Sequence, residues 1–167
     1  MLCTLNPNGL AFSPDESLLY INDTTRRHIR VFEVQPDGTL RNGRLFYDAR
    51  GDEPGNPDGM KVDTEGNVYC TGPAGIHVID PNGKLLGRMK IPGHVTNMAW
   101  GDADWGSLYI TTRDSVYRVR LNVAGIPVSC AIGSTLSGGK LTRGGIDPLS
   151  PTGECLKSRT GVKTGTG

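Results

Sequence analysis

The sequence predicts an all-β fold, specifically a partial β-propeller of about three blades with a disordered C-terminal tail. No window longer than about ten residues repeats apolar side chains at helical spacing, whereas short alternating apolar runs between turn residues recur throughout. Groups of these runs repeat about every 40 to 50 residues, which is the repeat length of propeller blades. Tyr20, Tyr69 and Tyr109 occupy the same place in the second strand of each repeat. An unrelated β-sandwich predicts no such register.

The first repeat, over residues 6–49, is expected to form a four-stranded meander. Its predicted strands cover residues 10–12, 18–21, 29–34 and 39–46. Turn residues separate these strands, including the polar loop 22–28 and the sequence Pro36-Asp37-Gly38.

Two further repeats are expected over residues 55–93 and 94–128, completing a propeller region at 1–128. The third repeat has strands at 98–100, 107–110 and 116–119 but no outer strand. Three blades cannot close a ring, so sheet faces that normally pack on neighbouring blades would contact water. We therefore expect self-association through the unclosed blade edges.

Residues 129–167 contain no aromatic side chain and are rich in Gly, Ser, Thr and Lys. Such a segment cannot bury enough apolar surface to offset the entropy lost on ordering. It is predicted to be a disordered tail.

Bulk properties exclude several classes of partner. With 18 basic and 17 acidic side chains the formal charge is +1, which gives no basis for binding nucleic acid or an anionic membrane. There is no apolar run of about 18 residues and no signal-peptide pattern at the start of the sequence.

The four cysteines form no C-x-x-C motif and are interpreted as free thiols in a reducing, cytoplasmic compartment, although two disulfides remain an alternative. The three histidines share no metal-ligand spacing and are read as ordinary strand or loop residues.

Two turns carry the candidate site. Asn8 and Asp58 each follow a proline, precede a glycine and lie two residues before the first apolar residue of an innermost strand. In a meander blade these strand starts share one mouth, so we expect both side chains at the same end. Pro36-Asp37-Gly38 and Pro81-Asn82-Gly83 have the same composition, but they join third and fourth strands and belong to the opposite rim.

An amide oxygen with a carboxylate suits a hard divalent cation, which takes six to eight oxygen ligands in the case of Ca²⁺. Calcium is favoured, with zinc, magnesium and manganese as alternatives. Asn8 and Asp58 cannot complete such a site, so further ligands must come from elsewhere. Asn97 is offset by one position and is interpreted first as a strand-start residue and only second as a ligand.

A cation so placed would polarise a carbonyl and acidify bound water, and Asp58 could accept the proton from that water. The predicted reaction is ester or lactone hydrolysis. The sequence has neither G-x-S-x-G nor a phosphate-binding G-x-x-x-x-G-K-[ST] motif. The alternative is a non-catalytic binding or scaffold fragment in which the turns only shape the strands. The loop Arg26-Arg27-His28 could bind an acidic sugar, but a solvated loop is the preferred interpretation.

The two motifs together resemble a known family. Pro7-Asn8-Gly9-Leu10-Ala11-Phe12 and Asn56-Pro57-Asp58-Gly59-Met60 are similar to successive motifs of the senescence marker protein/gluconolactonase/luciferin-regenerating enzyme family. The sequences Gly75-Ile76-His77-Val78 and Thr96-Asn97-Met98-Ala99-Trp100-Gly101 resemble its gluconolactonase branch. The resemblance covers residues 6 to about 127.

This resemblance implies a six-bladed propeller with one catalytic divalent cation that hydrolyses a sugar lactone such as gluconolactone. It implies that Asn8 and Asp58 are metal ligands and that Asp58 is the general base. The family's metal-binding Glu, a second Asn and a substrate-binding Arg belong to a part that this sequence does not contain. We therefore expect the chain to correspond to about the C-terminal half of such an enzyme and to be weak or inactive alone.

Overall fold

The computed structural model describes residues 6–128. The predicted disordered tail at 129–167 lies outside the described residues, as do Cys3, Cys130 and Cys155. Within the described part every regular element is a β-strand, which confirms the all-β class. No helix in that part is long and apolar enough to cross a membrane.

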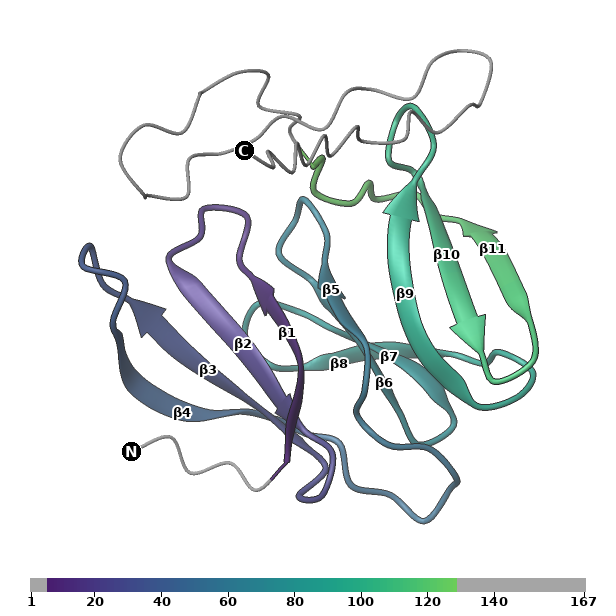
Figure 1. The fold of residues 1–167 in the computed structure, drawn as a ribbon, viewed down its shortest axis with the longest axis horizontal. Coiled ribbons are helices and arrows are strands. Elements are labelled where there is room, and N and C mark those ends of the chain that lie inside the picture. The colour runs from purple at the N-terminus through teal and green to yellow at the C-terminus, as the bar shows by residue number, and fades with distance from the viewer. Residues whose placement is uncertain (1–5, 129–167) are drawn as a thin grey trace, which may run out of the picture. The chain divides into compact units, whose positions relative to one another are not determined.

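Three antiparallel sheets make up the region from residue 6 to residue 128 (Figure 1). The first sheet has the order β1-β2-β3-β4, and the second has the order β5-β6-β7-β8. The third contains β9, β10 and β11, with β10 in the middle. The strands run as follows: β1 Pro7–Phe12, β2 Leu18–Asp23, β3 His28–Val34, β4 Leu40–Asp48, β5 Met60–Val62, β6 Val68–Gly72, β7 Gly75–Ile79, β8 Leu85–Met89, β9 Val95–Gly101, β10 Ser107–Thr112 and β11 Val116–Arg120.

Each sheet is a meander in which sequential strands pair, so its connections alternate between two ends. The β1 start pairs with the β2 end, at Pro7 and Asp23, and the β3 start pairs with the β4 end, at His28 and Asp48. These positions define one end, called the mouth below. The turns 35–39 and 80–84 join β3 to β4 and β7 to β8. They therefore lie at the opposite end, as the sequence predicted.

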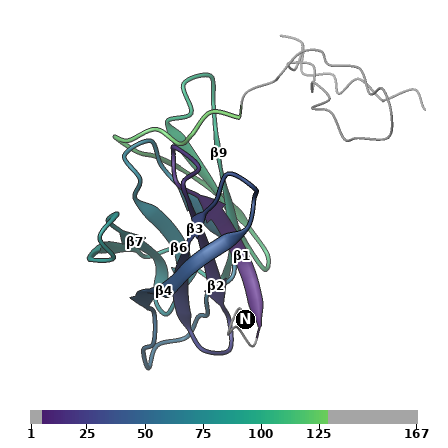
Figure 2. The ribbon, with the colours of Figure 1, turned by 90° about the vertical axis from the view of Figure 1, so that its left-hand side faces the viewer.

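Two apolar clusters join consecutive sheets. The first contains Tyr20 and Ile29 from the first sheet with Met60 and Val68 from the second. The second contains Tyr69 and Ile76 from the other face of the second sheet together with four side chains of the third, which are Val95, Met98, Leu108 and Ile110. The first and second sheets thus each pack their tyrosine-bearing face on the following sheet, and Figure 2 views the stack from the side of the first sheet.

The exposure of the three repeat tyrosines shows which sheets are covered by a following sheet. Tyr20 is 2% exposed and Tyr69 is 5% exposed because the following sheet covers each of them. Tyr109 is 37% exposed, and no fourth sheet covers its face among the described residues.

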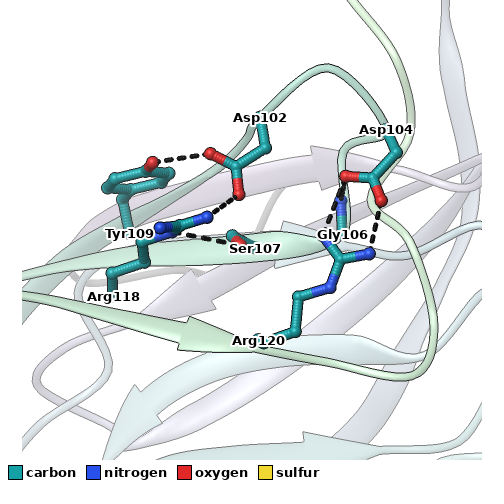
Figure 3. A network of polar contacts seen from close by, with 7 residues as sticks. All are labelled: Asp102, Asp104, Gly106, Ser107, Tyr109, Arg118 and Arg120. Carbon is teal, nitrogen blue, oxygen red and sulfur yellow. Dashed lines mark hydrogen bonds and ion pairs between the residues drawn. The ribbon is translucent and has the colours of Figure 1, made fainter.

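Polar contacts brace the third sheet at the end opposite the mouth (Figure 3). The Tyr109 hydroxyl donates to Asp102 at 2.7 Å, and Arg118 forms an ion pair with the same carboxylate. Arg120 pairs with Asp104, whose Oδ1 also accepts from the Gly106 amide at 3.1 Å. Hydrogen bonds from Ser107, Tyr109 and Arg118 lower the pKa of Asp102 to about 2. These pairs are exposed, so they fix the β9–β10 turn on β11 while adding little to stability.

Candidate metal-binding and active site

The segments that carry Asn8 and Asp58, called the mouth turns below, lie against each other at the mouth. The sequence predicted Asn8 in a turn before the strand, but Asn8 lies within the irregular start of β1, whereas Asp58 lies in the loop before β5. A Cβ atom added to Gly9 would lie 2.1 Å from the Asp58 carbonyl oxygen, so only glycine permits this approach. The strand pairing shifts register between Pro7 and Leu10, which places the bulge at Asn8 and Gly9. The structure therefore brings together two residues that are fifty positions apart in the sequence.

Asn22, at the end of β2, bridges the two turns. Its side chain is fully buried, and its Oδ1 accepts a hydrogen bond from the Gly9 amide at 3.0 Å. Its Nδ2 donates to the Asp58 carbonyl oxygen at 2.8 Å. Thr24 makes a second bridge, because its hydroxyl donates to the Pro57 carbonyl at 2.8 Å and accepts from Asn8 Nδ2 at 3.3 Å.

Thr71, on β6, holds the second turn from its other side. The Asp58 amide donates to Thr71 Oγ1 at 2.7 Å, and that hydroxyl donates to the Asn56 carbonyl at 2.9 Å. Thr71 is 1% exposed. Both backbone polar groups of Asp58 are therefore held by buried side chains, one from each of two sheets, which fixes the direction in which its carboxylate leaves the chain.

The side-chain oxygens of Asn8 and Asp58 remain available. Asn8 uses its Nδ2 in the bond to Thr24, and within residues 6–128 its Oδ1 accepts no hydrogen bond. The half-buried Asp58 carboxylate likewise has no hydrogen-bond or ion-pair partner in the described part of the chain. An oriented carboxylate without a protein partner is what a metal ion or a reacting water requires.

These oxygens fit a hard divalent cation in chemical type but not in number. Two oxygen donors fall short of the six to eight that calcium takes. No group of three or more His, Cys, Asp and Glu side chains that could hold a metal occurs among the described residues. The histidines do not fill this gap. His77 is 1% exposed and contacts the Tyr47 hydroxyl at 3.1 Å and the Pro73 carbonyl at 2.7 Å.

Strand register shows why Asn97 differs from the two predicted ligands. Leu10, Met60 and Met98 pair with equivalent residues of the second strands, which are Ile21, Cys70 and Ile110. The position of Asn8 and Asp58 is therefore occupied by Thr96 in the third sheet, and Asn97 stands at the position of Gly9 and Gly59. Asn97 therefore lies one residue after the position of Asn8 and Asp58 in the strand register, as its offset in the sequence indicated.

Arg26 and Arg27 lie at the mouth end in the loop between β2 and β3, and His28 is the first residue of β3. Arg27 donates to the Gly51 carbonyl at 3.0 Å, and Arg26 and His28 line a pocket of about 390 Å³ with Leu45, Asp48 and Arg50. Arg50 donates to Asp48 and lowers the pKa of that carboxyl to about 2. Burial lowers the pKa of His28.

Asn22, Thr24 and Thr71 are the residues that sequence reasoning missed. Their signal was nonetheless present, because Asn22, Thr71 and Thr111 each lie two residues after a repeat tyrosine. Thr111 has the same role in the third sheet, where its hydroxyl donates to the Asn97 carbonyl at 3.3 Å.

Comparison with known proteins identifies the family. The model of the SMP-30/Gluconolactonase/LRE-like region matches residues 4–114. This chain belongs to that family. The chain is 36% identical over 129 residues to the gluconolactonase of Zymomonas mobilis, and the match covers 71% of this chain and 36% of that protein. It is 34% identical over 151 residues to the regucalcin of Danio rerio, covering 87% and 50% of the two chains.

Solved structures agree with this assignment. A gluconolactonase from Xanthomonas campestris superposes with a TM-score of 0.62 at 36% identity, covering 70% of this chain and 38% of that one. A luciferin-regenerating enzyme gives a TM-score of 0.64 at 30% identity, with coverage of 75% and 49%. The family member thus spans between 30% and 50% of the length of the curated relatives that it matches.

Proposed function

We propose that this family member contributes half of a site that hydrolyses a sugar lactone, with Asn8 and Asp58 as ligands of a divalent cation and Asp58 as the general base. Relatives named gluconolactonase, pentonolactonase and L-arabinolactonase support lactone hydrolysis as the reaction class. The observation that carries the proposal is the juxtaposition of the two turns, whose backbones are clamped while the Asn8 Oδ1 and the Asp58 carboxylate have no partner in the described chain.

The reaction needs a base close to an attacking water. The Asp58 carboxylate takes a proton from water as the water oxygen attacks the lactone carbonyl carbon. The ring carbon–oxygen bond then breaks, and the proton held by Asp58 passes to the departing ring oxygen. The product is the open hydroxy acid, and the base is regenerated without a covalent intermediate.

When bound, a divalent cation would polarise the lactone carbonyl and lower the pKa of the attacking water. Asn8 and Asp58 would hold the cation through one neutral and one anionic oxygen. The remaining ligands must come from outside residues 6–128. All-oxygen ligation favours calcium, and zinc, magnesium and manganese are the alternatives. A calcium-binding regucalcin from Agrobacterium tumefaciens has the same fold, with a TM-score of 0.64 at 23% identity.

The proposal includes an architecture and a location. The three stacked sheets would be consecutive blades of a six-bladed propeller whose mouth contains the cation, as the family resemblance implies. The proposed location is a reducing, cytoplasmic compartment. Cys70, the one cysteine among residues 6–128, is a buried thiol whose pKa burial raises to about 12. The scaffold alternative does not account for a partnerless Asp58 carboxylate held in place from two sheets.

The test compares two aspartates in similar turns. Asp58→Ala should lower kcat for glucono-lactone hydrolysis by roughly 10²-fold or more, which is the usual contribution of a general base. Asp37→Ala alters a Pro-Asp-Gly turn at the opposite end and should leave kcat unchanged. Activity would be followed by acid release with each of the four cations. The assay uses the 167-residue chain and a chimera in which residues 6–128 replace the matching segment of the Zymomonas mobilis gluconolactonase.

If the chimera folds, binds the cation and keeps full activity after Asp58→Ala, the assigned base is wrong and the scaffold alternative is favoured. Circular dichroism of both variants would show whether a loss of activity reflects a loss of fold.

A further inference from the structure

Asn97 occupies a position where close packing dictates glycine in the other two sheets. A Cβ on Gly9 would lie 2.1 Å from the Asp58 carbonyl oxygen, and a Cβ on Gly59 would lie 2.6 Å from the Asn97 Cα. Each of these glycines therefore makes room for the strand start of the following sheet. Asn97 is exposed and faces no such strand within the described residues. Packing therefore explains why a side chain fits at this position, but not why that side chain is an amide.

Thr96, which holds the register position of Asn8 and Asp58, is already committed to other contacts. Its hydroxyl lies 3.0 Å from Thr111 Oγ1 and 3.2 Å from the Thr111 carbonyl oxygen. The third sheet thus offers no free ligand at that position. Its free polar group at the mouth is displaced by one residue, to Asn97.

Local contacts fix the Asn97 amide group. The Met98 backbone N–H donates to its side chain at 2.8 Å, and because that donor requires an acceptor, the contacting atom is Oδ1. The Thr111 hydroxyl donates to the Asn97 carbonyl, and the Asn97 Oδ1 lies 2.5 Å from where a Gly59 Cβ would be. The backbone of Gly59 donates in turn to the Thr96 carbonyl at 2.9 Å. The amide group is therefore held beside the residue that follows Asp58.

Nδ2 is the atom of Asn97 left without a partner in the described chain. We infer that Asn97 is a substrate-binding residue, whose Nδ2–H donates a hydrogen bond to a hydroxyl or ring oxygen of the sugar lactone bound at Asp58. This inference rests on the proposed function, since it takes the substrate class from that site. A polyhydroxylated ring presents acceptor oxygens around its whole edge, and a donor with a fixed direction selects one orientation of that ring.

The experiment records amide NMR spectra of the ¹⁵N-labelled 167-residue chain, and of the chimera described above, while D-gluconate, the stable open product, is added in the presence of Ca²⁺. We expect the Asp58 backbone amide and the Asn97 side-chain amide to shift with the same saturation curve. In Asn97→Gly, which installs the residue of the other two sheets, and in Asn97→Ala, which removes the amide group without adding a charge, gluconate affinity should fall at least fivefold. Asn82→Gly, in a turn at the far end, is the matched control and should not change it.

The outcomes separate the two proposals. If the Asp58 amide responds while the Asn97 side chain does not, or if both Asn97 variants bind gluconate as the parent does, the role of Asn97 is refuted and the lactone site stands. If neither group responds to gluconate with any of the four cations, in the chimera as well as in the 167-residue chain, the proposed site itself fails.

Discussion

Buried polar side chains join the two mouth turns at the scale of single residues. The fully buried Asn22 side chain contacts both turns, because its Oδ1 accepts from Gly9 and its Nδ2 donates to the Asp58 carbonyl. Buried Thr71 holds the second turn from β6. Leaving such groups unpaired costs about 1–3 kcal/mol each, so the arrangement strongly favours one geometry. The proposed role of Asp58 depends on this, because a carboxylate that binds a cation is most effective when its direction is fixed before the substrate arrives.

His77 gives a pH prediction. Burial, opposed by the hydrogen bond to Pro73 and aided by nearby Arg88, lowers its pKa below the ordinary value of 6.5. The unfolded chain therefore binds a proton at His77 before the folded chain does. Stability associated with neutral His77 is complete above about pH 6.5 and is lost as the pH falls below that value.

We expect the free energy of unfolding to decrease between pH 7 and pH 5, and to decrease less steeply in His77→Gln, as measured by urea denaturation at each pH. Asp37→Asn serves as control because the pKa of Asp37 lies below its ordinary value of 3.8, outside this interval. Parallel curves for the parent and His77→Gln would refute the assignment.

At the scale of elements, the strand starts of the first and second sheets each approach the following sheet closely. Gly9 and Gly59 serve this purpose without positive φ angles, since steric contact alone requires the missing side chain. The approach sets the position of the innermost strands β1, β5 and β9 around the mouth. The sequence motif Asn-Gly or Asp-Gly thus combines a glycine that packing requires with a side-chain oxygen that we propose binds the cation.

Gly9→Ala should destabilise the fold by roughly 2 kcal/mol or more, because its methyl group would overlap the Asp58 carbonyl oxygen and force the turns apart. Gly87→Ala, on β8, has open space around the new methyl group and should change stability by less than about 0.5 kcal/mol or increase it slightly. Thermal or urea denaturation of both variants tests this. Equal changes in stability for the two variants would show that the two mouth turns can separate at no cost in free energy.

At the scale of the whole described region, the free face of the first sheet is largely apolar, with Arg30 as the charged residue of its cross-strand row. Leu10, Ile21, Arg30 and Leu45 form one cross-strand row on this face, and Leu10 and Leu45 are both more than half exposed. Exposed apolar rows of this kind promote association. The face is the one that stacks on a preceding sheet at the two internal junctions, so its exposure follows from the open arrangement.

We therefore expect concentration-dependent self-association that Leu10→Lys reduces. Leu86, on β8, is equally exposed at 57%, so Leu86→Lys is a control for the added charge and should leave association unchanged. Sedimentation velocity across a range of concentrations measures both. Association that is reduced equally by the two variants would place the contact elsewhere.

The sequence alone determined the strand-rich class, the repeat marked by Tyr20, Tyr69 and Tyr109, the rim assignment of the turns and the resemblance carried by the Asn8 and Asp58 motifs. These follow from local rules, since alternation and turn chemistry act within a few residues. Only the tertiary structure showed that Asn22, Thr24 and Thr71 hold the two mouth turns, that Thr96 takes the register position of Asn8 and Asp58 in the third sheet, and that Asn97 stands in place of glycine. Those features depend on hydrogen bonds between sheets and on strand register, which arise only when segments distant in sequence are packed together.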